Sequence, residues 1–427
     1  MSKARSFSRA RALVAPTFAA LALVITAPLR AQSAAPTPHG DVGADASSAV
    51  TSLADPSAPP PSANKEESSP RTPAEKKKPR KDDGWPDLSA FLDEKYGFLP
   101  IAMPITEPAV GYGAMGGLAF LSKSLGDASK GLGRPNITFV GGMGTANGSW
   151  GAFGIDSRYW LEDHIQTLAA GIYASVNLDF HGIGADSKLE NNPIRYNLEP
   201  KGGMISAKYR LGETRYWAGL GYAFASTKVT FDAPDSTPNL PDYQRISNTG
   251  LLLPTVNLDT RDNVFTPTRG VYLEVNVNIA GKWLGGDNNF ARPNFTAIQY
   301  LPLPHDFYFG LNLQGSAAFG DTPFYMNPYV SLRGVPVMRY QGQEVLALEG
   351  ELRWQFWKRF SILGFAGAGN AWNNFEKLDN SQGVVSGGGG FRYELARKYG
   401  IHMGADLAFS RDTTAFYIQV GSAWMRP

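Results

Sequence analysis

The stretch that decides the fold is Tyr329-Val-Ser-Leu-Arg-Gly-Val-Pro-Val-Met-Arg-Tyr-Gln-Gly342. It lies between two segments in which apolar and polar residues alternate as in β-strands, Asp306–Gly320 and Glu344–Phe356. The stretch is too long for a tight hairpin turn and too apolar for a solvated loop. We expect the other strands to close a barrel and this loop to fold into the lumen. Arg333 would then need a carboxylate partner, because an unpaired charge away from bulk water is costly.

The alternation with a period of two continues along most of the chain after Ala109. In the segment 271–279, for example, aliphatic residues alternate with tyrosine, glutamate and asparagine. A soluble β-sandwich would show the same pattern, but two features favour a transmembrane barrel. The expected strands are about 10–14 residues long, against about five or six in soluble sheets. Aromatic residues also gather at the strand ends, like the girdles at a membrane interface.

The connections between the expected strands alternate in length. Leu161–Asp163 and Pro302–His305 are short, whereas His181–Pro193 and Asp321–Gln343 are long, which is typical of an outer-membrane barrel with short periplasmic turns. The pattern predicts an all-β fold, a transmembrane antiparallel barrel of about 16 strands. The strands that we count are odd in number, whereas bacterial single-chain barrels have an even number. Either Phe98–Thr106 is a poor, proline-bearing first strand, or one strand is misassigned.

Composition and motifs exclude several classes of protein. The chain has 427 residues and no cysteine, and its formal net charge of +2 gives no field that points to nucleic acid. The five histidines show no metal-ligand spacing, and no nucleophile-elbow motif is present. We therefore expect a protein that is not an enzyme and that holds no cofactor or metal.

The segment before the barrel divides into three parts. Residues 1–31 have the basic start and apolar core of a signal peptide, although a membrane anchor is an alternative. Residues 32–84 are rich in proline, serine, alanine and then lysine, which predicts a disordered periplasmic segment whose basic run contacts anionic headgroups or is a solvated tether. Residues 85–108 are expected to form a short amphipathic helix, a plug or a docking segment, and the barrel is expected over 109–427.

The run Leu258-Asp-Thr-Arg-Asp-Asn-Val-Phe-Thr-Pro-Thr-Arg-Gly270 resembles the strand–turn–strand signature of the surface-antigen barrel family. That family includes the BamA/TamA outer-membrane insertases and the two-partner secretion transporters. The motif positions are Asp259, Arg261, Asp262, Pro267, Arg269 and Gly270. Asp259 and Arg261 share a strand face, so an ion pair in the lumen is favoured over a catalytic carboxylate pair.

The Arg333-Gly334 pair looks like the Arg-Gly motif on the long inward loop of the same family. The resemblance implies that acidic residues on the lumen face of the next strands hold the arginine. Glu351 is the expected partner, with Glu349 as a further candidate, although Glu351 could instead pair with Arg353 or with a neighbouring strand. In the family, a second carboxylate is expected on the following strand, but here Gly367 stands at that position. The contact between the loop arginine and the lumen carboxylates, which we call the clasp, is therefore expected to be weaker or to rely on Glu351 alone.

The resemblance also implies a function and a location. The chain looks like a barrel-only branch of the family without the periplasmic POTRA repeats. It is then expected to sit in the bacterial outer membrane and to aid insertion or translocation of outer-membrane proteins or lipids through a weak seam between its first and last strands. Glycines of the expected first strand, Gly111, Gly113 and Gly116, would weaken that seam.

The expected partners are outer-membrane lipids and lipopolysaccharide, client proteins and further copies of the chain, with no nucleic acid. The alternative is a passive channel or a structural barrel without assembly activity.

Overall fold

A computed structural model describes residues 83–89, 99–121, 136–184, 189–190, 192–232, 243–373 and 381–425. The expected signal peptide and nearly all of the expected disordered segment therefore lie outside the described residues, as does most of the expected helix. Within the described residues, no helix is both long enough and apolar enough to cross a bilayer. The described residues from Asp87 onward belong to one compact unit.

One antiparallel sheet of eighteen strand segments makes up this unit. The segments are β1 (Leu99–Ile105), β2 (Gly113–Leu121), β3 (Ile137–Thr145), β4 (Trp150–Trp160), β5 (Ile165–Phe180), β6 (Ile194–Arg210), β7 (Tyr216–Phe231), β8 (Tyr243–Leu252), β9 (Thr255–Asp259), β10 (Gly270–Ala280), β11 (Phe290–Leu303), β12 (Phe307–Ala317), β13 (Phe319–Gly320), β14 (Glu344–Trp357), β15 (Phe360–Trp372), β16 (Ser381–Ala396), β17 (Ile401–Ser410) and β18 (Thr414–Val420). Two short 3-10 helices, η1 (Lys282–Leu284) and η2 (Phe324–Met326), lie in connections.

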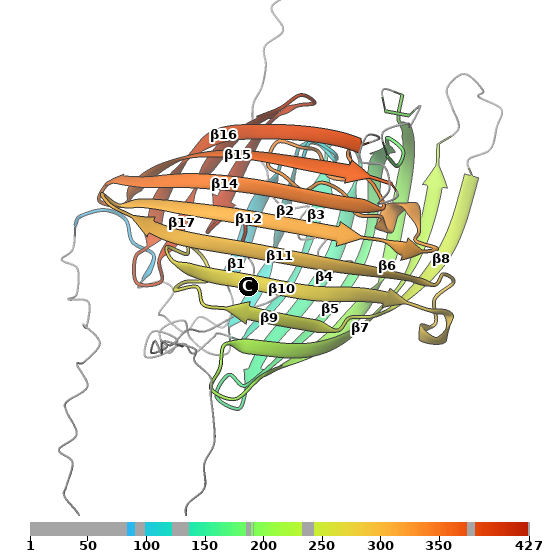
Figure 1. The fold of residues 1–427 in the computed structure, drawn as a ribbon, viewed down its shortest axis with the longest axis horizontal. Coiled ribbons are helices and arrows are strands. Elements are labelled where there is room, and N and C mark those ends of the chain that lie inside the picture. The colour runs from blue at the N-terminus through green and yellow to red at the C-terminus, as the bar shows by residue number, and fades with distance from the viewer. Residues whose placement is uncertain are drawn as a thin grey trace, which may run out of the picture. The chain divides into compact units, whose positions relative to one another are not determined.

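The segments follow one another around a barrel wall, with β9 to β16 on the near side and β2 to β6 behind them (Figure 1). Two of the segments continue the strand before them. β8 and β9 both pair with β7 and β10, and β12 and β13 both pair with β11. Pro254 lies in the first break, where its missing N–H interrupts the ladder. The eighteen segments therefore form sixteen barrel strands, an even number as in other bacterial single-chain barrels.

The first barrel strand is β1, and this corrects the expected start of the barrel at Ala109. β1 lies inside the segment 85–108, for which a helix, plug or docking segment was expected, and it supplies the proline-bearing first strand of the alternative assignment. It pairs in full register with β2 alone. Pro100 and Pro104 weaken the strand signal in the sequence, but proline is tolerated on an edge strand because only one side needs backbone donors.

The described part of the expected helix, Asp87–Ser89, docks against the barrel at the β14–β15 turn and the end of β16. The Asp87 carboxylate lies 3.0 Å from Nη2 of Arg359, and the Leu88 N–H donates to the Leu395 carbonyl at 2.9 Å. These contacts fit the docking role that the sequence left open for this segment.

The wall is apolar outside and polar inside, the reverse of a soluble protein. On β10, Leu273 and Val275 are exposed on the outer face, whereas Glu274 and Asn276 are buried on the inner face. Exposed leucine, valine, isoleucine and phenylalanine side chains recur on β7, β9, β12, β14, β15 and β17. So large an exposed apolar surface marks contact with lipid rather than water, and it decides against the soluble sandwich.

The connection between β13 and β14, residues 321–343, folds into the lumen as the sequence predicts. We call it the lumen loop. Its apolar side chains pack in a buried cluster with β14, β15 and β16, made up of Val330, Leu332, Val335, Tyr340, Val345, Ala347, Ala371 and Val384. Gly334 adopts a φ of 84°, a left-handed conformation in which glycine is favoured.

Candidate functional site

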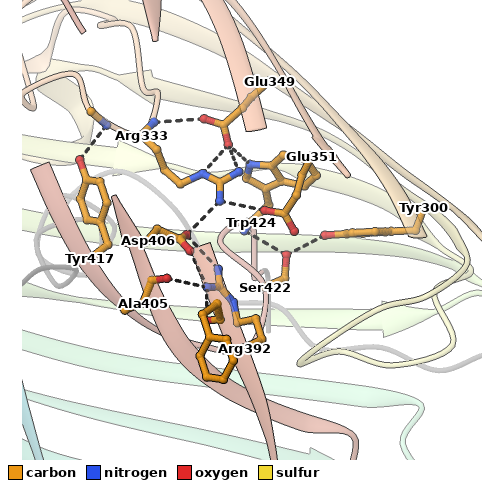
Figure 2. Close-up of polar contacts among 12 residues, drawn as sticks. Tyr300, Arg333, Glu349, Glu351, Arg392, Ala405, Asp406, Tyr417, Ser422 and Trp424 are labelled. Carbon is orange, nitrogen blue, oxygen red and sulfur yellow. Dashed lines mark hydrogen bonds and ion pairs between the residues drawn. The ribbon is translucent and has the colours of Figure 1, made fainter. Parts of the chain in front are cut away.

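Arg333 of the lumen loop lies against two carboxylates of β14 (Figure 2). Its Nε donates to Oε1 of Glu349 at 2.8 Å, its Nη2 lies 2.7 Å from the same oxygen, and its backbone N–H donates to Oε2 at 3.1 Å. Its Nη1 lies 2.8 Å from Oε2 of Glu351. The structure thus brings Arg333 to both candidate glutamates, and Glu349 makes the more extensive contact.

A third carboxylate comes from Asp406 on β17, which the sequence analysis missed. Nη1 of Arg333 donates to its Oδ2 at 3.0 Å, and Nη2 of Arg392 on β16 donates to the same oxygen at 2.8 Å. The sequence did hold a signal for it. Asp406 is the one carboxylate on its strand, and it lies on the same, inward-facing side of the strand as His402. Asp406 lies two strands after β15, the strand on which the resemblance implied a second acid.

The site at Gly367, where that acid was expected, is tightly packed. A Cβ at Gly367 would lie 2.9 Å from Cδ2 of Leu332 and 3.0 Å from the Leu348 carbonyl. The lumen loop therefore occupies the space that a side chain on this strand would need. The clasp does not rely on Glu351 alone, because Glu349 and Asp406 supply two further carboxylates.

Aromatic side chains enclose the arginine. The guanidinium carbon of Arg333 lies 3.6 Å from the Phe365 ring centre and 5.8 Å from that of Trp424. The indole N–H of Trp424 donates to Oε1 of Glu349 at 2.7 Å, and the Gly334 N–H donates to the Tyr417 hydroxyl at 2.8 Å. The C-terminal segment thus contributes directly to the clasp (Figure 2).

The buried cluster holds two guanidinium groups and three carboxylates, those of Arg333, Arg392, Glu349, Glu351 and Asp406. Burial by itself lowers the pKa of the Arg333 guanidinium, but the charges of the three carboxylates outweigh it, so the pKa lies above its ordinary value. Arg333 therefore stays charged at every accessible pH. Such a network fixes the position of the loop against the wall more than it adds net stability. Removing one partner, however, leaves a buried charge without an opposite charge.

The motif between β9 and β10 forms a turn that side-chain contacts hold in place. Arg261 and Asp259 form a buried ion pair with Nη2 and Oδ2 2.6 Å apart, and the Asp262 carboxylate accepts from the N–H groups of Thr268 and Arg269. Gly270 has a φ of 107°, and a Cβ there would meet the Thr260 carbonyl at 2.3 Å. Pro267 lies in the same turn. These contacts give the motif a structural role.

The glycines assigned to the seam lie elsewhere, which is a correction. Gly113 and Gly116 belong to β2, which pairs with β1 on one side and β3 on the other, and Gly111 lies in the turn before β2. The error follows from the start of the barrel: once β1 is the first strand, β2 is no longer at the edge.

Among the described residues, no group of three or more histidine or acidic side chains is arranged to hold a metal ion. The fold and the site define a sixteen-stranded barrel whose polar lumen holds an inward-folded loop, fixed to the wall through an arginine. The comparisons with known proteins agree with this class. The Omp85 superfamily domain matches residues 132–410, more than half of the chain, and the protein belongs to that superfamily of outer-membrane barrels.

Solved structures share the fold at low sequence identity. BamA from Haemophilus ducreyi lacking POTRA domains 1–3 aligns with a TM-score of 0.51 and 13% identity, covering 77% of this chain and 69% of that one. CdiB from Escherichia coli aligns with a TM-score of 0.52 and 10% identity, covering 78% of this chain and 61% of that one. A comparison with curated proteins finds no significant match.

Proposed function

We propose that this barrel aids the insertion or translocation of outer-membrane proteins or lipids in the bacterial outer membrane, through a seam between β1 and β18. The observation that carries the proposal is the pairing of these strands. Among the described strands, β1 forms a ladder only with β2, and β18 only with β17. A side-chain hydrogen bond, from Thr106 Oγ1 to the Phe416 carbonyl at 2.7 Å, spans the seam.

The two edges of the seam differ in what they offer to an incoming strand. Pro100 and Pro104 have the same phase along β1 and no N–H, so proline is accommodated there with the imino nitrogen facing away from the β2 ladder, toward the seam. β18 contains no proline, so each of its residues keeps a backbone N–H, and one carbonyl on its outer edge, that of Phe416, already accepts from Thr106. We propose that a client strand pairs with β18, and that β1 is the poorer template.

Lipids, lipopolysaccharide, client proteins and further copies of the chain are the proposed partners. The exposed apolar wall supports contact with lipid. The competing proposal, a passive channel or structural barrel, receives less support as a channel because the lumen loop fills part of the lumen. The connection after β5 also meets this loop, with the Gly184 N–H donating to the Gln341 carbonyl at 2.9 Å.

The test is a folding assay in liposomes. The protein is reconstituted and the folding rate of a reporter barrel protein is measured, with ion flux recorded in parallel. The chain has no cysteine of its own, so Ala102→Cys with Ile418→Cys can be bridged by a short bis-maleimide to lock the seam. We expect faster reporter folding with the open seam and loss of the effect when it is locked. Ion flux without faster folding would support the channel instead.

A further inference from the structure

No strand ladder joins β1 to β18, so other contacts must hold the two sides of the seam together. The lumen loop touches both sides from within. On the side of the last strands, Gly334 donates its N–H to the Tyr417 hydroxyl of β18, and Arg333 binds Asp406 of β17. A Cβ at Gly334 would lie 3.0 Å from Cβ of Ala408, so the loop backbone is pressed against β17.

On the side of the first hairpin, the loop is held by Glu107 in the turn between β1 and β2. Oε1 of Glu107 accepts from the Val337 N–H at 3.0 Å, and from the Ala109 N–H of its own turn at 3.5 Å. Met338 packs in a buried cluster with Ile105 of β1 and Val110 of the turn. Only two residues separate Gly334 from Val337, so a short segment of the loop reaches from one edge of the seam to the other.

We propose that the lumen loop is a strap across the seam, and that Glu107 is the positioning residue that fastens it to the first hairpin. The strap holds β1 next to β18 from inside and limits how far the seam opens. Its geometry is independent of the proposed function, but its consequence for assembly rests on that function.

The charges around Glu107 make the strap sensitive to pH. Among the described residues, no cation lies within ion-pair distance of its carboxylate. The charge of Glu107 acts on Tyr417 of β18, which also senses Glu349 of β14 and Arg333 of the loop. Burial raises the pKa of Glu107 to about 7, against the two hydrogen bonds that lower it.

The sign of the effect follows from this raised pKa. The folded, strapped state binds the proton more tightly than a solvated carboxyl does, so its extra stability is present below the ordinary carboxyl pKa and is lost as the pH rises through about 7. Glu107 would therefore be mostly protonated at pH 5.5 and mostly ionised at pH 8.5. The strap should therefore loosen toward alkaline pH.

The experiment measures the width of the seam by pulsed electron paramagnetic resonance. Spin labels are placed on Ala102→Cys and Ile418→Cys in the full chain, reconstituted in lipid, and distances are recorded at pH 5.5 and 8.5. We expect a narrow distribution at pH 5.5 and a broader, longer one at pH 8.5. Glu107→Gln keeps an acceptor oxygen without a charge, so it should stay narrow at both values. Glu107→Leu should be broad at both, while Glu274→Leu on β10 should behave like the parent.

The strap is overturned if Glu107→Leu leaves the distances at pH 5.5 as narrow as in the parent, or if Glu107→Gln keeps the full pH response. If Glu107→Leu does not fold, the proposal is decided by comparing the change of the seam distances with pH in the parent and in Glu107→Gln. Reporter folding is measured on the same samples. If the seam widens as expected but the protein does not speed reporter folding, the strap is supported and the proposed function is refuted.

Discussion

Glu349→Gln is expected to destabilise the barrel by about 3 kcal/mol, because it removes one partner of a buried charge pair. The Glu349 carboxylate accepts hydrogen bonds from the backbone N–H and Nε of Arg333 and from Trp424 Nε1, and its side chain is 3% exposed. Its loss therefore disrupts both the loop arginine and the C-terminal tryptophan.

The same change at Glu351 should cost about 1 kcal/mol or less. Glu351 Oε2 is in ion-pair contact with Arg333 but has no hydrogen-bond partner among the described residues, and the side chain is 14% exposed. Arg333 keeps Glu349 and Asp406 as partners.

The assay is equilibrium urea unfolding in lipid vesicles, followed by tryptophan fluorescence. The double change Arg333→Met with Glu349→Gln should cost less than the sum of the single changes, because the pair is lost together. The reasoning is refuted if Glu351→Gln costs as much as Glu349→Gln, or if the two changes at Arg333 and Glu349 are additive.

Three further changes test the packing of the site. Gly367→Asp should displace the lumen loop, because the new side chain meets Leu332, and ion flux through the reconstituted barrel should rise. Gly270→Ala should cost about 1–3 kcal/mol in urea unfolding, from its positive φ and the contact with the Thr260 carbonyl. Asp406→Asn should cost about 3–5 kcal/mol in the same assay, since two guanidinium groups then share no aspartate, and an unchanged midpoint would contradict this.

Much of the clasp could be predicted because strand alternation assigns faces without three-dimensional information. The phase of β14 places Glu349 and Glu351 on the lumen side together, and the apolar, arginine-bearing connection before it has to fold inward. The requirement for an even number of strands also favours a strand in 98–106, where β1 lies.

The sequence by itself determined the barrel, the polar lumen and the inward loop, because these follow from a local period of two and from the cost of burying charge. Only the tertiary structure decided the other partners of the loop. Asp406 and Trp424 reach Arg333 because the barrel curvature brings β17 and the C-terminal segment to the loop, and Glu107 of the first hairpin reaches Val337 of the loop inside the lumen. Such contacts join residues far apart in the chain, and alternation specifies the face of a residue but not its neighbour across the lumen.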